Sequence, residues 1–322
     1  MTASSTGATR PAATAVDDAA RLRGVLPVLS TPFHADGRVD YTGFARIVDH
    51  VVATGVAGVM FPGFASEFHK LSDDERWRLN DIVLERTHSR PHVAAVISVA
   101  NHATYLAVEA VKRAVSGGAD AINVLPPYFL RPPAAEIQAH LEAVVDAAAP
   151  VPVIVQLAPD LTGSGLTVDR LLALRRALPN FGVVKVETNP AGPMVSALAA
   201  ADPPLASLVG YAGLHMLDAA ARGARGVQPG CSFAEIYVEI WNAWTTGDEV
   251  RATDLHRRLL PFLTYWMQDL ELIVQVEKLI SVRRGLIASD HCRRPRRSLD
   301  RMEVQSVDRF LTEFAEELPP VS

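Results

Sequence analysis

The feature that most limits the possible folds is a regular alternation of two sequence patterns, which begins at residue 24. Short apolar or β-branched runs are typical of buried strands, and the amphipathic stretches that follow them are typical of helices. The expected strands span residues 25–33, 58–63, 92–99, 121–125, 151–157, 182–187, 207–213 and 226–230. The expected helices lie near residues 40–54, 72–88, 103–117, 134–148, 167–178, 191–201, 215–223 and 233–246. Eight such pairs over about 220 residues predict an α/β fold, a (β/α)8 TIM barrel.

A doubly wound parallel sheet shows the same alternation and is the alternative fold. The eightfold count and the absence of a Gly-x-Gly-x-x-Gly motif favour the barrel. Residues 250–318 contain no strand pattern and are expected to form three further helices. We therefore expect a disordered N-terminal tail at 1–21, a barrel at 22–248, and a C-terminal helical extension at 249–322 that packs on the barrel. The tail is rich in Ala, Thr and Ser and lacks the apolar segment of a signal peptide.

Charge and cysteine content narrow the class of partner. The formal net charge of −5 argues against nucleic acid or an anionic membrane as a partner. The run 293–297 is basic, and we expect it to be a solvated loop or an oligomer contact. No apolar run reaches the length of a membrane span. Two cysteines, Cys231 and Cys292, are too few for a disulfide framework, so we expect a reducing compartment, the cytoplasm.

Lys185 lies near the end of the apolar run 181–187, which is the sixth expected strand. Lysine is rarely placed in such a run, because burying an ammonium group without a partner is costly. Burial favours the uncharged amine, which can attack a carbonyl carbon. A side chain that reaches solvent from the strand end is the alternative. Active sites of (β/α)8 barrels form at the C-terminal ends of the strands, and this position favours a catalytic lysine.

Glu187 is expected on the same face of this strand as Lys185. Side chains alternate along a strand with a period of two, so Val183, Lys185 and Glu187 point the same way. Glu187 then lies nearer the mouth of the barrel, either as a base or as the group that positions Lys185. A mouth carboxylate paired with an arginine or lysine is the alternative.

Several motifs, in a consistent order and spacing, together resemble those of one known family. They are Gly24-Val25-Leu26-Pro27-Val28-Leu29-Ser30-Thr31-Pro32-Phe33, Gly37-Arg38-Val39-Asp40, Gly63-Phe64-Ala65-Ser66-Glu67, Leu71-Ser72-Asp73-Asp74-Glu75-Arg76, Pro127-Tyr128-Phe129, the stretch from Pro159 to Gly163, and Val184-Lys185-Val186-Glu187. From about residue 24 to 316 the chain resembles the dihydrodipicolinate synthase/N-acetylneuraminate lyase family, whose members are class I Schiff-base (β/α)8 enzymes. The resemblance implies that Lys185 forms an imine with a 2-keto acid.

With this resemblance we expect a small-molecule 2-keto acid as substrate and no cofactor beyond the covalent imine on Lys185. No metal is expected, since His69, His102 and His215 do not have a metal-ligand spacing. We also expect a homo-oligomer, either a dimer or a tetramer.

The departures from the family pattern concern its proton relay. Phe64, Gln156 and Phe129 stand where a threonine and two tyrosines of the synthases would stand. Leu161 stands where an arginine would hold the carboxylate of a second substrate. The chain is therefore not expected to be a genuine dihydrodipicolinate synthase.

The replacements themselves resemble the 2-keto-3-deoxy-sugar-acid dehydratase branch, notably 2-keto-3-deoxyarabonate dehydratase. The similar features are Ser66-Glu67, Gln156, Lys185-Val186-Glu187-Thr188, Gly210-Tyr211-Ala212-Gly213, Arg222-Gly223-Ala224 and Pro229-Gly230. Leu157 departs from this branch, which would have an acid there.

The expected catalytic residues are Lys185, Glu187 and Gln156. The expected substrate-binding residues are Ala65, Ser66, Phe64, Tyr128, Phe129 and Gly213. For Gln156 the alternative is a core amide that the backbone satisfies. In the family the loop of Ala65 and Ser66 holds the keto-acid carboxylate, and backbone amides there need no particular side chain; the alternative is a simple turn. We expect Phe64 and Phe129 to line the cavity, with ordinary core packing as the alternative. Tyr128 can supply a hydroxyl only if it points inward, and Glu67 is expected to hold the loop.

Three functions remain open on these grounds. Dehydration of a 2-keto-3-deoxy sugar acid, or of a related hydroxy keto acid, is the expected reaction. A retro-aldol cleavage that releases pyruvate, or the aldol reaction that uses it, shares the same iminium. A non-catalytic barrel that binds a keto acid is the third, and retention of Lys185 argues against it because an unused buried lysine is destabilising.

Overall fold

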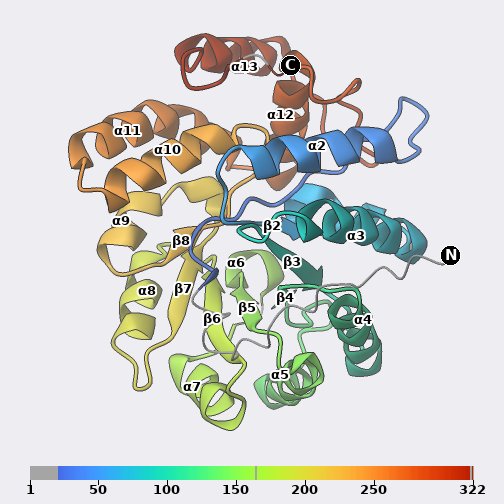
Figure 1. The fold of residues 1–322 in the computed structure, drawn as a ribbon, viewed down its shortest axis with the longest axis vertical. Helices are drawn as coiled ribbons and strands as arrows, with labels where there is room; N and C mark the ends of the chain where they lie inside the picture. The colour runs from blue at the N-terminus through green and yellow to red at the C-terminus, as the bar shows by residue number, and fades with distance from the viewer. Residues whose placement is uncertain (1–20, 164, 320, 322) are drawn as a thin grey trace, which may run out of the picture.

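The computed structural model describes residues 21–163, 165–319 and 321 and confirms the (β/α)8 barrel (Figure 1). All but the last residue of the tail expected at 1–21 lies outside the described residues. The strands are β1 Gly24–Val25, β2 Gly58–Phe61, β3 Ala94–Val99, β4 Ala121–Val124, β5 Val153–Leu157, β6 Phe181–Val186, β7 Ala206–Val209 and β8 Gly226–Val227. They are parallel and follow the order β1-β8-β7-β6-β5-β4-β3-β2.

The barrel closes between β1 and β2 through isolated contacts rather than a regular ladder. Val28 bridges Met60, and the Met60 amide donates to the Pro27 carbonyl at 2.9 Å. The expected first strand at 25–33 is therefore much shorter as a regular strand. Pro27 and Pro32 interrupt it because proline has no N–H to donate to a ladder.

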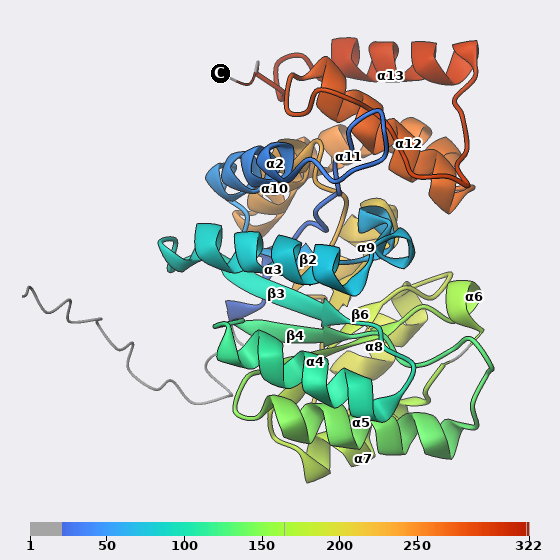
Figure 2. The same cartoon turned by 90° about the vertical axis from the view of Figure 1, so that its right-hand side faces the viewer.

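Helices cover the outside of the barrel (Figure 2). They are α2 Tyr41–Ala53, α3 Asp73–His88, α4 Thr104–Ser116, α5 Ala134–Ala148, α7 Val168–Ala177, α8 Gly192–Ala199, α9 Met216–Ala221 and α10 Ala234–Thr245. Ser72 and Glu75 form a capping box at the start of α3, with N–O distances of 3.2 and 3.0 Å. None of the helices in the described part of the chain is long and apolar enough to cross a membrane.

Four short helical turns follow strand ends, and the sequence patterns did not predict them. They are η1 Phe64–Ser66, η2 Phe68–Lys70, α6 Pro159–Thr162 and η3 Tyr211–Gly213. In Figure 2, α6 lies at the end of the barrel toward which the strands point. The turns therefore shape the mouth at which barrel enzymes carry their active sites.

Three further helices stand beside the barrel, as expected: α11 Glu249–Trp266, α12 Leu270–Arg283 and α13 Arg301–Glu313. Figures 1 and 2 show them together at one side of the barrel. The rings of Trp266 and Phe310 lie 5.3 Å apart, and Phe310 contacts Phe233 before α10 at 5.0 Å. This aromatic cluster joins the added helices to the barrel.

The basic run 293–297 is a loop, as expected, but only its middle residues, Arg294 to Arg296, are exposed to solvent. Arg293 is half-buried and donates to both carboxylate oxygens of Glu75 and to the Gly37 and Lys70 carbonyls. Arg297 pairs with Glu303 at 2.6 Å. At least two of these arginines therefore connect parts of the fold, because a guanidinium has enough donors to join several acceptors.

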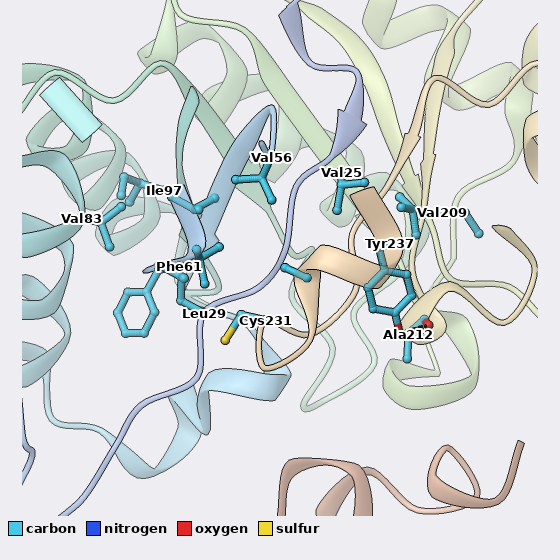
Figure 3. Close-up of a cluster of buried hydrophobic side chains, with 14 of the residues drawn as sticks. Val25, Leu29, Val56, Phe61, Val83, Ile97, Val209, Ala212, Cys231 and Tyr237 are labelled. Carbon is cyan, nitrogen blue, oxygen red and sulfur yellow. Dashed lines mark hydrogen bonds between the residues drawn. The ribbon is translucent and has the colours of Figure 1, made fainter. Parts of the chain in front are cut away.

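The core has two layers that follow the alternation of side chains along the strands. Ile154 and Val183 belong to the apolar filling of the barrel interior, together with Leu26, Val96 and Leu208. Residues of the opposite parity face the helices, and Figure 3 shows Phe61 and Ile97 near Val83 of α3, and Val209 near Tyr237 of α10. Since Val183 points into the barrel, Lys185 two residues later points the same way.

Candidate active site

Lys185 occupies the top layer of the barrel interior. Its residue is only 3% exposed, and it pairs in register with Gln156 on the neighbouring strand β5. The Nζ atom lies 3.3 Å from Oε1 of Glu187. The expected placement of an inward lysine with a carboxylate above it is therefore present. The snorkelling alternative does not apply, because the amine stays inside the barrel.

A chain of polar side chains leads away from Lys185 across four neighbouring strands. Gln156 donates to Oε2 of Glu187 at 2.6 Å, and Asn123 of β4 donates to the Gln156 oxygen at 3.0 Å. Asn123 also lies 2.9 Å from the hydroxyl of Ser98 on β3. The Gln156 amide thus has a defined orientation, with its NH2 group toward Glu187. Each carboxylate oxygen of Glu187 has a different partner, which restricts its rotation.

Gly210, directly after β7, makes room for this carboxylate. A Cβ at position 210 would overlap the side chain of Glu187. A glycine is needed here because of this close approach. The first glycine of the Gly210-Tyr211-Ala212-Gly213 motif therefore has a local physical role beside Lys185 and Glu187.

Lys185 and Glu187 line a cavity of about 150 Å³. Part of its wall comes from the turns at the barrel mouth: Phe64 and Ala65 of η1, Leu161 of α6 and Tyr211 of η3. Further wall comes from the segment after β8 and from the C-terminal extension: Gln228, Pro229 and Gly230, Met267 between α11 and α12, and Leu270, Ile273, Val274 and Glu277 of α12. The cavity is lined mainly by apolar side chains with a few polar groups. That composition is typical of small-molecule sites.

Tyr211 brings a phenol to this cavity. Its hydroxyl donates to Oδ2 of Asp160 at 3.3 Å. Burial, together with the nearby carboxylates of Asp160 and Glu187, raises the pKa of Tyr211 to about 12. The phenol therefore stays protonated at neutral pH and acts as a hydrogen-bond donor.

Glu67 has the structural role that the sequence predicts. It is 1% exposed, adopts a left-handed backbone conformation with φ of 54°, and forms ion pairs with Lys278 of α12 and with Lys70, the latter at 3.1 Å. Lys278 also donates to the His291 carbonyl and stacks over the Phe33 ring. The buried pairs tie the loop after β2 to the C-terminal extension.

The expected binding residues divide between the cavity and its surroundings. Phe64 and Ala65 line the cavity, as expected. Ser66 is fully buried behind it; its hydroxyl donates to the Leu29 carbonyl and its amide to the Gly63 carbonyl. Ser66 is therefore a loop-stabilising residue, and Ala65 is the remaining candidate for carboxylate binding.

Three other expected residues lie away from the cavity. Phe129 is 78% exposed, so the expectation that it lines the cavity is wrong. Tyr128 packs edge-on against His102 with 4.7 Å between ring centres. Gly213 does not line the cavity, and its carbonyl accepts a hydrogen bond from His256 at 3.0 Å. Strand alternation does not extend past Val124, because Pro126 and Pro127 lead the chain out of the barrel.

Four polar residues of the site were not named as site residues from the sequence: Asn123, Tyr211, Gln228 and Glu277. Asn123 interrupts the apolar run of β4 as Lys185 interrupts that of β6, so the same signal applies to it. Glu277 lies on a buried face of α12, where an acid is equally unusual. Tyr211 and Gln228 carry no such signal.

Comparisons with known proteins agree with the fold and with the motifs. YagE of Escherichia coli K12, provisionally named a 2-dehydro-3-deoxy-D-gluconate aldolase, is 28% identical over 86% of this chain and 92% of its own. The crystal structure of YagE in complex with pyruvate superposes with a TM-score of 0.83 and covers 91% of this chain and 99% of that one.

YjhH of E. coli K12, provisionally named a 2-dehydro-3-deoxy-D-pentonate aldolase, is 27% identical over 74% of this chain and 80% of its own. The 4-hydroxy-tetrahydrodipicolinate synthase of Acidothermus cellulolyticus is 32% identical over 74% of this chain and 76% of its own. The family model described as the dihydrodipicolinate synthetase family matches residues 21–314. This chain therefore belongs to the dihydrodipicolinate synthetase family, a family of lyases.

Proposed function

We propose that the protein is a Schiff-base lyase that dehydrates a 2-keto-3-deoxy sugar acid or a related hydroxy keto acid. The observation that carries the proposal is the Lys185 amine, which is buried in a small cavity within 3.3 Å of one carboxylate. Burying an ammonium group here without a use would be costly, whereas an amine in this position can attack the carbonyl carbon of a bound keto acid.

The reaction would begin with attack of the Lys185 amine on the C2 carbonyl of the keto acid. Loss of water gives an iminium, which acidifies the C3 protons. Glu187 takes one C3 proton and leaves an enamine. The enamine electrons expel the C4 hydroxyl, which departs as water with the proton from Glu187. Hydrolysis of the conjugated iminium frees Lys185, so the net change is the loss of one water from the substrate.

Two groups of the site support this role for Glu187. Gln156 holds Oε2 by a hydrogen bond of 2.6 Å, which leaves Oε1 toward Lys185 and the atoms bound to it. The Ala65 amide, at the wall of the same cavity, is the candidate donor for the substrate carboxylate. These groups would hold C3 near the base, which is the orientation that proton transfer requires.

Retro-aldol cleavage is the second candidate, because YagE and YjhH are provisionally named aldolases. It needs a base at the C4 hydroxyl. The phenol in the cavity, Tyr211, has its pKa raised to about 12, mainly by burial, and is a poor base at neutral pH. The position of the family's strand-five tyrosine holds Gln156, which cannot accept a proton as a phenolate does. These features favour dehydration over cleavage.

Borohydride trapping followed by mass spectrometry tests the proposal. Reduction in the presence of pyruvate or of a 2-keto-3-deoxy acid should add mass to Lys185, and Lys185→Ala should abolish the adduct. Analysis of the products without borohydride then separates the candidates. A dehydrated keto acid supports the proposal, whereas pyruvate and an aldehyde support cleavage. Labelling of a different lysine, or of none, would contradict the Schiff-base chemistry, and trapping without turnover would indicate a binding protein.

A further inference from the structure

The C-terminal extension contributes a carboxyl group to the cavity that the reaction above does not use. Glu277 of α12 is 3% exposed and lines the same cavity as Lys185. Its Oε2 accepts a hydrogen bond from the Ser232 amide at 2.9 Å. Its Oε1 has no hydrogen-bond partner among the described residues. A buried polar atom without a partner destabilises the fold, so such an atom in a residue of the cavity wall calls for an explanation.

A second residue of the cavity wall also has an atom without a partner. Gln228, directly after β8, is 2% exposed and also lines the cavity. Its NH2 group lies 3.4 Å from the Met60 sulfur, a weak acceptor, and its Oε1 has no partner in the described part of the chain. Because the cavity holds only about 150 Å³, one small molecule bound to Lys185 lies close to both side chains.

The backbone around Glu277 leaves space for this arrangement. Gly230 also lines the cavity, and a Cβ at position 230 would overlap the carboxyl group of Glu277. Any other residue would therefore displace the carboxyl group. The acid is thus accommodated by its surroundings, in the same way as Gly210 accommodates Glu187.

The protonation state of Glu277 decides which ligand group fits. Burial raises the pKa of its carboxyl, although the Ser232 amide acts in the opposite direction. A neutral carboxyl donates one hydrogen bond, and the Gln228 oxygen accepts one. An alcohol can accept the first and donate the second. A carboxylate has no proton to donate to the amide oxygen, and a methyl group leaves both atoms unpaired.

We propose that Glu277 and Gln228 form a polar subsite that binds a hydroxyl group in the chain of the substrate beyond C3. The proposal rests on the Schiff-base function above and deepens it. It identifies the substrate class as hydroxylated 2-keto acids, in preference to pyruvate or to keto acids with a second carboxylate. A site that hydrogen-bonds a hydroxyl rejects the analogue that lacks it, because the polar groups of the site are then left unpaired.

The trapping assay, repeated with three different keto acids, tests the subsite. The concentration that gives half-maximal labelling of Lys185 is measured for pyruvate, 2-oxoglutarate and 2-keto-3-deoxyarabonate. We expect the unaltered chain to prefer the hydroxylated acid over each of the others by about tenfold or more. Glu277→Leu and Gln228→Leu should each reduce this preference about tenfold, and Glu277→Gln, which keeps a neutral donor, should retain most of it.

Gln275→Leu is the matched control. Gln275 is a buried polar residue on the same helix that does not line the cavity, and it donates to the Asp290 carbonyl. Its removal should leave the preference unchanged. Circular dichroism shows which variants fold, and if Glu277→Leu does not, Gln228→Leu decides by the same criterion.

The outcomes separate this inference from the function on which it rests. If pyruvate labels Lys185 but the unaltered chain has no preference for the hydroxylated acid, the subsite is wrong and the Schiff-base function stands. A preference that survives Glu277→Leu or Gln228→Leu in a folded chain also overturns the subsite, and indicates that water alone occupies these atoms. If no keto acid labels Lys185, both proposals fail.

Discussion

Glu187 is two residues from Lys185 on one strand face, and this spacing gives the carboxylate access to whatever the amine binds. Its two oxygens have separate partners, Lys185 and Gln156. Nothing in imine formation itself requires a carboxylate, since the amine alone can attack. Proton removal from C3 does require a base, so the two steps should respond differently to loss of the charge.

We expect Glu187→Gln to retain borohydride trapping and to lose turnover. General acid–base catalysis typically contributes ~10²–10⁴-fold, so the dehydration rate should fall by about that factor. Single-turnover kinetics with a 2-keto-3-deoxy acid would measure this. Gln156→Ala is the comparison, because it removes only a neutral hydrogen bond worth roughly 0.5–1.5 kcal/mol. Normal turnover in both variants would show that neither residue has the assigned role.

The chain should not condense pyruvate with aspartate semialdehyde. Three positions where the synthase relay has hydroxyls hold Phe64, Phe129 and Gln156, and Leu161 replaces the arginine expected to bind the carboxylate of the second substrate. A coupled assay for dihydrodipicolinate formation should give no signal above a Lys185→Ala control. Robust synthesis would mean that these positions are wrongly matched to the family pattern.

At the scale of elements, the pair of Glu67 and Lys278 joins η1 to α12. Both residues are almost completely buried. Removing one member of a buried pair leaves the other charge uncompensated, and this is more costly than removing both. The two sides differ here. Glu67 retains Lys70, whereas the remaining partners of Lys278 among the described residues are the His291 carbonyl and the Phe33 ring.

Glu67→Gln should therefore lower the free energy of unfolding by about 3–5 kcal/mol. Lys278→Met should cost less, and the double variant should be more stable than Glu67→Gln alone. Urea unfolding of the four chains gives the coupling energy through a double-mutant cycle. If the three variants differ from the unaltered chain by strictly additive amounts, the two side chains do not interact.

Glu235 at the start of α10 connects three helices. Its carboxylate accepts hydrogen bonds from His50 of α2 at 2.9 Å and from Arg284, at the end of α12, at 2.5 Å. Burial alone would raise the pKa of Glu235, but these two partners outweigh it and lower the pKa from 4.5 to about 2. A lowered pKa in the folded state means that the interaction stabilises the fold above the ordinary pKa and is lost in acid.

We expect Glu235→Gln to destabilise the protein near neutral pH by at most about 3 kcal/mol. The difference from the unaltered chain should stay constant above about pH 4.5 and shrink as the pH falls toward about 2. Denaturant unfolding at pH 7, 4.5 and 3 measures it. A difference that is the same at all three values would contradict the assigned ion pairs.

For the molecule as a whole, the barrel could be predicted because its signals are local. Apolar runs and amphipathic stretches arise from short-range periodicity, and all eight strands and the three C-terminal helices appear near their expected positions. Strand ends were less predictable. β7 ends at Val209, and Tyr211 and Ala212 then adopt positive φ values near 50°. Tertiary contacts, such as the hydrogen bond from Tyr237 to the Ala212 carbonyl, support that turn, and no local pattern contains them.

The site could be predicted only where it follows a strand. Lys185 and Glu187 were identifiable because strand alternation sets their direction, and Gln156 because it stands where the family pattern has a tyrosine. The prediction that Phe129 lines the cavity was wrong, because this residue lies beyond the last residue of β4, where the alternation of side chains no longer applies. Glu277 comes from a helix far along the chain, and sequence separation conceals such a neighbour. A polar residue inside an apolar run was the sequence feature that best indicated a residue of the site.

The position of α12 in the sequence has a consequence for how the chain folds during its synthesis. Two adjacent residues of this helix have different roles: Glu277 lines the cavity, and Lys278 holds the loop after β2 through its ion pair with Glu67. The ribosome reaches them only after all eight strands have been synthesised, and domains begin to fold while synthesis continues. A nascent barrel can therefore form before the wall of its cavity is complete. Chains that end before α12 lack part of the cavity wall and one contact of the loop after β2, so they should process a keto acid more slowly than chains that include this helix.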